Sequence, residues 1–169
     1  MQLLKTIGIK KNNIKYRKRD AARAIVLDDI GRLALLFVSK KNYHKLPGGG
    51  LEDGENTKKA LEREIREETG AKAQIIEQVG QIEEFRKTRD QHGDFLHQIS
   101  YCYIAQEVGN RKSPEFTEKE KSDGFELMWV ELDEAIELLE NDNPPDLNHK
   151  SIVERDLVFL HEAKRIIEN

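Results

Sequence analysis

The chain has 169 residues, of which 37% are hydrophobic and 36% charged, and its net charge is −4. This length fits a single domain over residues 1–169 and leaves no room for a second one, and the composition is typical of a soluble, cytoplasmic protein. The single cysteine, Cys102, excludes an internal disulfide and a cysteine-based zinc site, and we expect it in the core. No segment approaches the roughly 20 apolar residues that span a bilayer, so neither a membrane role nor export is expected.

The first 23 residues are strongly basic. Only one acid, Asp20, stands there against eight cations, which are Lys5, Lys10, Lys11, Lys15, Arg17, Lys18, Arg19 and Arg23. Such a run could attract a polyanion. A solvated edge strand with its flanks is the preferred interpretation, and we base no nucleic-acid claim on the run.

The first half of the chain is predicted to form a hairpin followed by a helix. In chain order we expect a strand over 21–27, a turn over 28–31, a strand over 33–38, a break over 45–50 and a helix over Thr57–Thr69. Gly70 follows this helix as its C′ residue.

The second half is predicted to form a second hairpin, a further strand and two helices. We expect strands over 73–85 and 95–105, a polar segment over 106–124, a strand over 125–130, and helices over 133–139 and 152–167. The segment 106–124 is too long for a tight turn and is a candidate functional loop. In the last helix one face is predicted to carry Ile152, Phe159, Leu160, Ala163 and Ile167. This mixed order of strands and helices favours one α/β domain.

Three glutamates fall on one face of the first predicted helix. At about 100° per residue, Glu64, Glu67 and Glu68 stand at i, i+3 and i+4. The apolar residues of the helix flank the same face, so the carboxylates should point towards the protein body. A solvated face laced with ion pairs is the common alternative for a Glu-rich helix, and here it suits only the opposite side.

Crowded, partly desolvated carboxylates imply a cation, because they repel one another unless a positive charge compensates. Oxygen ligands suit Mg²⁺, Mn²⁺ or Ca²⁺ rather than zinc. Mg²⁺ binds substrate phosphates together with protein carboxylates, so the helix predicts phosphate chemistry. The glycines over 48–50 would let the backbone approach a ligand closely.

The spacing of these residues resembles the Nudix box of the Nudix hydrolase superfamily. Residues 49–71 match it at every charged and glycine position: Gly49, Glu55, Arg63, Glu64, Glu67, Glu68 and Gly70. Ala71 is smaller than the aliphatic residue usual there. The segment from Trp129 to Ala135 also resembles the family. The resemblance implies a single-domain α/β fold, an α/β/α sandwich around a mixed β-sheet.

The resemblance also implies roles for the box residues. Metal ligands would be Glu67 and Glu68, with Glu64 ligating metal or helping to activate water. Arg63 would orient these glutamates by pairing with Glu55, and Gly49 would hold the loop geometry or offer its carbonyl to the metal. Gly70 supports the end of the helix. The implied cofactor is Mg²⁺ or Mn²⁺.

The implied reaction is attack of a metal-activated water on phosphorus in a nucleoside diphosphate linked to another group. Divalent ions orient the diphosphate and neutralise developing charge. Some relatives take the general base from a loop before the last strand, where this chain has Glu115, Glu118 and Glu120. We favour Glu120.

The substrate is not indicated by the sequence. Candidates for contacts with distal phosphates are Arg86, Lys87, Arg89 and His92, although a solvated hairpin tip is the preferred interpretation of this stretch. Tyr43 or Phe85 could stack on a base, although packing is the commoner role of such aromatics. The expected partner is a small nucleotide-type molecule. Nucleic acid is disfavoured by the negative net charge, since the basic N-terminal run is the only hint of an RNA 5′-end substrate. Relatives are often dimers, so a homodimer is compatible with the resemblance.

Two other functions were weighed. One is a catalytically silent Nudix domain that senses a nucleotide or regulates transcription, although such domains commonly lose box glutamates that are intact here. The other is a domain whose carboxylates only bind Ca²⁺, which would not need a glycine-rich approach to a ligand.

Overall fold

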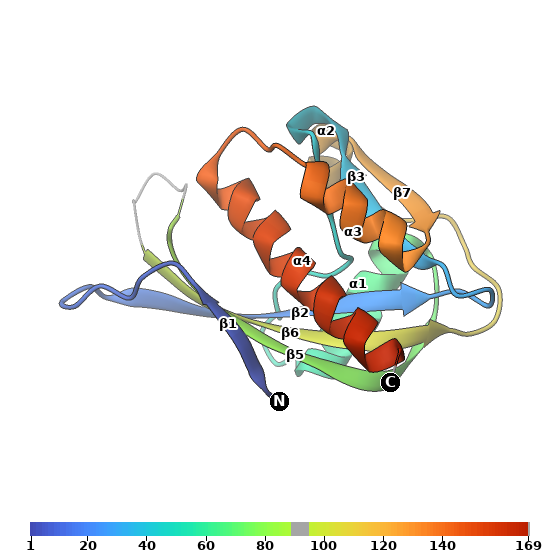
Figure 1. The fold of residues 1–169 in the computed structure, drawn as a ribbon, viewed down its shortest axis with the longest axis horizontal. Coiled ribbons are helices and arrows are strands. Elements are labelled where there is room, and N and C mark those ends of the chain that lie inside the picture. Colours follow the sequence, from blue (N-terminus) through green and yellow to red (C-terminus); the bar gives the residue numbers. More distant parts are fainter. Residues whose placement is uncertain (89–94, 169) are drawn as a thin grey trace.

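A twisted mixed β-sheet forms the centre of the protein, seen in a computed structural model that describes residues 1–88 and 95–168 (Figure 1). The strand order is β1-β5-β6-β2-β3-β4, and β7 also pairs with β3. The pairs β1/β5 and β2/β6 are parallel and the others antiparallel. The strands are β1 (Leu3–Ile7), β2 (Tyr16–Leu27), β3 (Leu33–Val38), β4 (Tyr43–Lys45), β5 (Ala73–Lys87), β6 (Phe95–Glu107) and β7 (Phe125–Val130).

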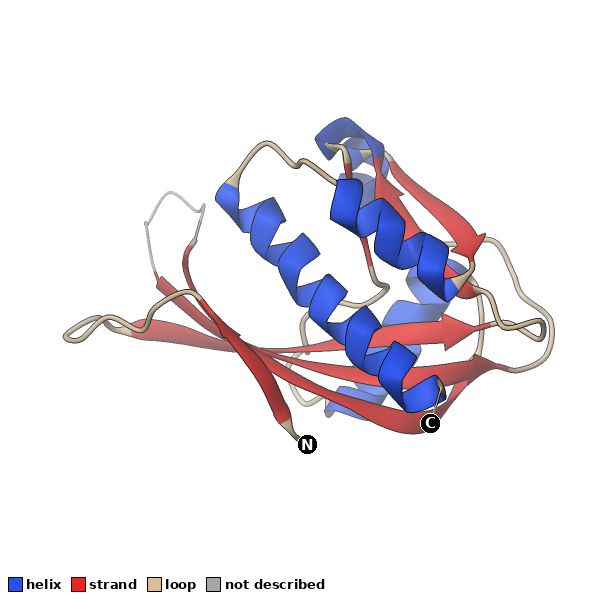
Figure 2. Ribbon diagram, in the orientation of Figure 1, coloured by secondary structure: helices blue, strands red, loops and turns tan. Residues whose placement is uncertain are grey.

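Helices cover both faces of this sheet (Figure 2). Helix α1 (Thr57–Thr69) packs on one face, where its apolar residues meet Ala22, Ala24 and Val26 of β2. Helices α3 (Leu132–Asn141) and α4 (Leu147–Ile167) pack on the other. Two short helices, η1 (Ser39–Lys41) and α2 (Glu118–Asp123), complete the described elements. The α/β/α sandwich around a mixed sheet is therefore confirmed.

Helix α1 has the bounds predicted from the sequence. The Asn56 side chain caps its start by accepting a hydrogen bond from the Lys59 amide at 2.9 Å. Gly70 ends the helix with φ 69°, and its amide donates to the Arg66 carbonyl. A residue other than glycine would be strained in this left-handed conformation. Both hairpins and the β7 strand are also confirmed.

Four elements were not predicted: β1, η1, β4 and α2. Helix α4 also begins before residue 152, because the Asp146 side chain caps it through the amides of Asn148 and His149. At its other end Ile167 is 48% exposed, so the apolar face of α4 is not buried along its whole length. The last buried residue of α4 is Ala163.

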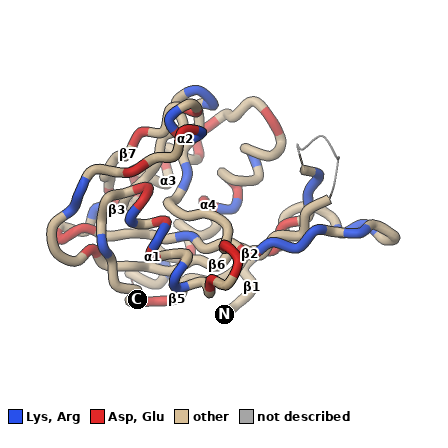
Figure 3. Tube along the Cα trace, turned by 180° about the vertical axis from the view of Figure 1, so that it is seen from behind, with Lys and Arg blue, Asp and Glu red and all other residues tan. Residues whose placement is uncertain are grey.

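Most side chains of the basic N-terminal run are exposed, and the later part of the run lies in the first half of β2 (Figure 3). Among the described strands this half pairs with β6 on one side, and β2 meets β3 only at Leu27, so its other side is an edge as expected. Lys5 lies on the edge strand β1 and pairs with Glu154. Arg23 is buried, and burial lowers its pKa to about 10. Cys102 is fully buried, and burial raises the pKa of its thiol well above the usual value, as expected of a core residue. No helix in the described ranges is long and apolar enough to cross a membrane.

Candidate active site

The three box glutamates differ in depth. Their side chains are 11% exposed at Glu64, 39% at Glu67 and 2% at Glu68. The difference follows from the packing of α1, because Ala60, Leu61 and Ile65 are buried against β2 and carry the neighbouring positions inward. Glu64 and Glu68 thus face the protein body as predicted, while Glu67 stands at the margin of that face.

Arg63 links the acidic side chains on this side of the helix. Its Nε and Nη2 each donate to a different Glu55 carboxylate oxygen at 2.9 Å, which is the pairing expected from the resemblance. Its Nη1 donates to Glu64 at 2.8 Å and more weakly to Glu67 at 3.4 Å, and Nη2 reaches the Gly50 carbonyl at 3.2 Å. The bonds from Arg63 lower the pKa of Glu55 to about 2, so Glu55 remains ionised.

The glycine loop lies directly against Glu64. A Cβ atom at position 49 would lie 2.1 Å from Oε1 of Glu64, so no side chain fits between the loop and the carboxylate. The carbonyl of Gly49 accepts a hydrogen bond from the Ala22 amide at 2.9 Å, and the Leu51 amide donates to Asp20. These bonds fix the loop to β2.

Glu68 is enclosed by protein donors. The Lys45 ammonium lies 2.7 Å from its Oε1, and the Gly48 amide donates to Oε2 at 2.5 Å. Burial raises the pKa of Glu68, and the nearby Lys45 charge opposes that rise. Lys45 was not among the residues expected from the sequence, because a lone lysine beside a glycine loop carries no distinguishing pattern.

Two buried aspartates anchor the strand that carries Lys45. Asp142 accepts from the His44 amide at 2.6 Å and also contacts its ring, and Asp156 of α4 accepts from the Leu46 amide at 2.9 Å. Asp156 also pairs with Arg155 at 2.8 Å. No local sequence pattern indicates these contacts, since the partners are about a hundred residues apart.

The segment before α2 is fixed to the end of α1. The Lys112 amide donates to the backbone carbonyl of Gly70 at 2.9 Å, and the Glu115 amide donates to the backbone carbonyl of Glu67 at 2.7 Å. Glu120 lies close enough to raise the pKa of Glu67, although burial is the main cause of that rise. In this structure Glu120 serves a capping box, accepting from the Thr117 amide at 2.8 Å. Of the other two candidates, Glu118 is almost fully exposed and pairs with Lys121.

A hollow of about 360 Å³ opens beside Glu67. Cations and acids share its walls, which are formed by Lys59, Glu62, Arg63, Arg66, Glu67 and Glu115. Three of these side chains are positive and three are negative, and the two arginines and the lysine could each contact a phosphate.

The predicted substrate contacts are not gathered with the glutamates. Arg86 lines a different hollow, between the end of β5 and the start of α4, to which no residue of α1 contributes. Tyr43 is only 4% exposed and packs against His149, an arrangement typical of a core residue rather than of a base-stacking one. Phe85 stacks on His97 of β6. Arg89 and His92 lie outside the described residues.

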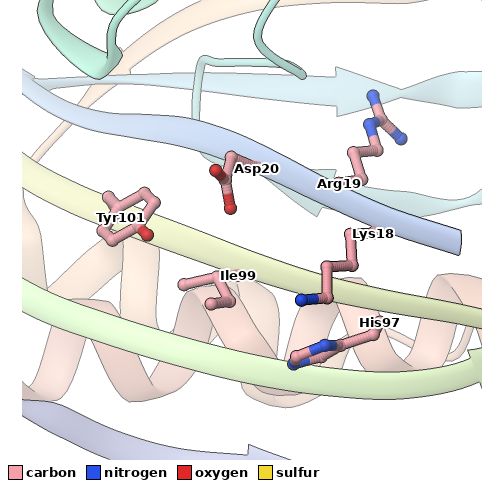
Figure 4. Close-up of a pocket in the computed structure, with 6 residues that line it drawn as sticks. All are labelled: Lys18, Arg19, Asp20, His97, Ile99 and Tyr101. Carbon is pink, nitrogen blue, oxygen red and sulfur yellow. The ribbon is translucent and has the colours of Figure 1, made fainter. Parts of the chain in front are cut away.

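Arg19 is a cation at the glycine loop that the sequence did not single out. A Cβ atom at Gly50 would lie 2.6 Å from its Nε, and Glu64 is near enough to influence its pKa. Within the described residues its guanidinium makes no hydrogen bond or ion pair. A cavity of about 330 Å³ borders it over β2 and β6, and Figure 4 shows Arg19 leaving β2 on the opposite side from Lys18.

The glutamate side chains of α1 offer only oxygen atoms as metal ligands, which suits a hard divalent cation. In addition, no side chain can intrude at position 49. Across residues 1–88 and 95–168 the carboxylates do not converge on one point as ligands. The carboxylates around α1 instead form ion pairs with a cation of the protein, either Arg63 or Lys45. A metal ion would compete with these pairs.

A mixed sheet between helices, with glutamates on a helix that follows a glycine loop, is the architecture of Nudix proteins. The sequence model of the NUDIX domain family matches residues 17–151, so the chain belongs to this family of hydrolases. No curated protein sequence matches the chain.

Solved structures are similar in fold. The MutT protein from Methanosarcina mazei Go1 is 20% identical with a TM-score of 0.56, over 90% of this chain and 99% of that one. The ORF135 protein of E. coli is 20% identical with a TM-score of 0.55, over 89% and 91%. A NUDIX hydrolase from Nitrosomonas europaea is 18% identical with a TM-score of 0.59, over 88% and 90%.

Proposed function

We propose that the protein is a Mg²⁺-dependent pyrophosphohydrolase that cleaves the diphosphate linkage of a nucleoside diphosphate joined to another group. The observation that carries this proposal is the contact of the Glu64 carboxylate with the Gly49 loop, beside Glu67 and Glu68 on the same helix. Membership of the NUDIX family supports it.

Glu64, Glu67 and Glu68 are the proposed metal ligands, with Mn²⁺ as an alternative to Mg²⁺. A divalent ion bound there lowers the pKa of water, orients the diphosphate and neutralises developing charge. Arg63 keeps two of these carboxylates in position through its bonds to Glu64 and Glu67, and it is itself held by Glu55. Glu67 is the most exposed of the three and faces the hollow beside α1.

Glu120 is the proposed general base, which takes the proton from the attacking water. Its electrostatic influence on Glu67 supports this assignment. In that role Glu120 would leave its bond with the Thr117 amide. Replacing Glu120 with Gln should lower kcat about 10²–10⁴-fold, whereas Glu118→Gln, two residues away and pointing to solvent, should not.

Cations beside the glutamates are the proposed phosphate contacts. Arg19 is exposed next to Gly50, and Lys59 and Arg66 line the hollow at Glu67. We propose a small nucleotide-type substrate, with the bond between its phosphates placed over Glu67.

The decisive experiment is release of phosphate or nucleoside monophosphate from a substrate panel, with and without Mg²⁺. The panel includes nucleoside triphosphates, oxidised nucleotides, ADP-ribose, nucleotide sugars, dinucleoside polyphosphates and capped RNA. Glu67→Gln tests the site, and Glu137→Gln on the exposed side of α3 is the matched control. Metal-dependent turnover that is lost only in Glu67→Gln supports the proposal. Tight binding without turnover across the panel would instead favour a nucleotide-sensing domain.

A further inference from the structure

A second hollow, which we call the tail hollow, lies at the C-terminal end of α1. Its volume is about 340 Å³, and its lining residues are Arg66, Gly70, Lys72, Asn110, Lys112, Ser113 and Glu115. Arg66 and Glu115 also line the hollow beside Glu67, so the two hollows adjoin. From Glu67 to Gly70 the helix rises about 4.5 Å. The tail hollow therefore lies roughly one helical turn beyond the proposed position of the cleaved bond.

The outer wall of the tail hollow belongs to the polar segment 106–124, which the sequence indicated as a candidate functional loop. Three backbone amides fasten this wall to α1 and to the residue before β5: those of Val108, Lys112 and Glu115 donate to the carbonyls of Lys72, Gly70 and Glu67 at 2.8, 2.9 and 2.7 Å. A side chain at position 70 would clash with the Lys112 carbonyl, so the wall lies directly against the helix end. Backbone contacts thus hold Lys112 at the hollow.

Three cations of the tail hollow are not engaged by the protein. The side chains of Arg66, Lys72 and Lys112 are exposed, and across residues 1–88 and 95–168 none of them forms an ion pair or a hydrogen bond. The neighbouring Arg111 differs, because it is held by an ion pair and lies 3.5 Å from the centre of the Trp129 ring. Arg66 stands in the last turn of α1, where the helix dipole also favours a cation. Lys72 and Lys112 lie outside the helix, so the dipole does not explain the whole group.

The lining of the tail hollow has an excess of positive charge. Its three cations face one acid, Glu115, which leaves two positive charges, whereas the hollow beside Glu67 has three charges of each sign. A terminal phosphate carries about −1.5 to −2 charges near neutral pH, so one such group would balance the excess. Asn110 and Ser113 add side-chain donors, and phosphate oxygens accept hydrogen bonds from both types.

We propose that the tail hollow binds the phosphates of a substrate that lie beyond the bond cleaved at Glu67. Arg66, Lys72 and Lys112 contact the oxygen atoms of the last phosphate. The ligand is therefore a nucleotide whose phosphate chain continues past the cleaved bond, in preference to one in which a sugar follows the second phosphate. The path of the substrate rests on the proposed function, whereas the binding of a phosphate chain to the tail hollow does not require turnover.

The first test is calorimetric titration of the full chain with inorganic tripolyphosphate in the absence of divalent metal. We expect the double variant Lys72→Gln with Lys112→Gln to bind at least about tenfold more weakly than the wild type, since it loses charge-assisted hydrogen bonds. Lys40→Gln with Lys58→Gln is the matched control, because both lysines are exposed and line neither hollow. The inference is overturned by no binding to the wild type, by an unchanged affinity in the first variant, or by equal weakening in both variants.

Glu115→Gln tests the same site in the opposite direction. It removes the one acid of the tail hollow and with it a like-charge repulsion against phosphate. The contact of residue 115 with α1 is made by its backbone amide, so the substitution keeps the wall in place. Tripolyphosphate should bind more tightly to this variant than to the wild type. An equal or weaker affinity would show that the anion does not lie in the tail hollow.

Kinetics connect the tail hollow with the substrate. For members of the panel that are turned over, Lys72→Gln with Lys112→Gln should raise KM about tenfold when the substrate has three or more phosphates. The kcat values, and KM for substrates with two phosphates, should not change. An equal rise in KM for both groups, or turnover confined to substrates with two phosphates, would contradict the inference. Tripolyphosphate binding without turnover of any panel member would refute the proposed function and leave the phosphate site in place.

Discussion

The carboxylate of Glu64 occupies the space that a side chain at Gly49 would need. Position 49 does not require a left-handed backbone, since its φ lies outside the range that favours glycine. The requirement for glycine is therefore steric, and it comes from a residue fifteen positions further along the chain.

We predict that Gly49→Ala displaces Glu64 and lowers kcat about 100-fold, because a shift of about 1 Å in a catalytic group has that effect. The protein should still fold, since the far end of a side chain is what gives way. Steady-state kinetics with circular dichroism checks both parts. Near-normal turnover of a folded Gly49→Ala protein would show that the position of Glu64 is not critical.

Arg63→Lys should reduce activity although the charge is kept. Lysine cannot bond both oxygens of Glu55 while also reaching Glu64 and the Gly50 carbonyl, as the planar guanidinium does. Loss of such a supporting contact costs about 10- to 100-fold in metal affinity or activity. Titration of turnover against Mg²⁺ concentration measures it. A lysine variant with an unaltered metal requirement would argue against this orienting role.

Asp156→Asn should destabilise the fold by about 3–5 kcal/mol, the usual cost of breaking a buried ion pair. The change removes the Asp156 carboxylate from Arg155, whose remaining ion pair with Glu84 is longer, at 3.8 Å, and it weakens the bond to the Leu46 amide. Urea denaturation measures this loss. The control is Glu154→Gln two positions earlier, where an exposed pair with Lys5 contributes no more than about 1 kcal/mol. Equal losses in the two variants would contradict the role given to Asp156.

Tyr43 should make stability fall at alkaline pH. Burial raises its pKa to about 12 in the folded protein, whereas an unfolded tyrosine titrates near about 10. Below the lower value both states keep the proton, and its contribution is fully present. Between the two values only the unfolded chain loses the proton, so up to about 2–3 kcal/mol is lost as pH rises.

Tyr43→Phe should remove this part of the alkaline loss. Denaturation of both proteins at a series of pH values up to about 11.5 gives the difference, and the lysines that titrate in the same range are common to both. The variant should also keep its turnover, because Tyr43 packs in the core. Loss of turnover without loss of stability would instead support the role in base stacking that the sequence suggested for Tyr43.

Arg19→Gln should raise KM and leave metal binding unchanged. A charged hydrogen bond contributes about 1.5–3 kcal/mol, which corresponds to a ten- to hundredfold change. Lys18→Gln provides a neighbouring control that points to the other face of β2. If kcat falls while KM stays constant, Arg19 does not act by binding the substrate.

Local signals explain what the sequence predicted well. The bounds of α1 follow from the Asn56 cap and Gly70, and both are properties of neighbouring residues. The two missed strands depend on distant partners. Strand β4 has only three residues and exists because it pairs with β3. Strand β1 is mostly exposed, without the alternation that marks a half-buried strand, and it is defined by parallel pairing with β5.

The residues of the candidate site likewise divide into those that a local pattern indicates and those that depend on distant partners. The spacing of the box indicated Glu55, Arg63 and the three glutamates, since a helix brings them together within a few turns. Lys45, Asp156 and Arg19 were missed because tertiary packing brings them to α1 and its loop. Tyr43 was assigned to substrate since an aromatic residue near a strand end has the same appearance in the sequence whether it packs or stacks.

The parallel pairing of β2 with β6 bears on the order of folding. The glycine loop is fastened to β2 through Ala22 and Asp20, and the register joins β2 to residues such as Gln106, which is 79 positions from Leu27. Contacts between such distant segments form slowly, because a long loop must first close. During synthesis, helix α1 would leave the ribosome well before β6, the strand that pairs with β2 beneath the helix. We therefore expect activity to return late in refolding, together with the sheet signal and after the helical signal.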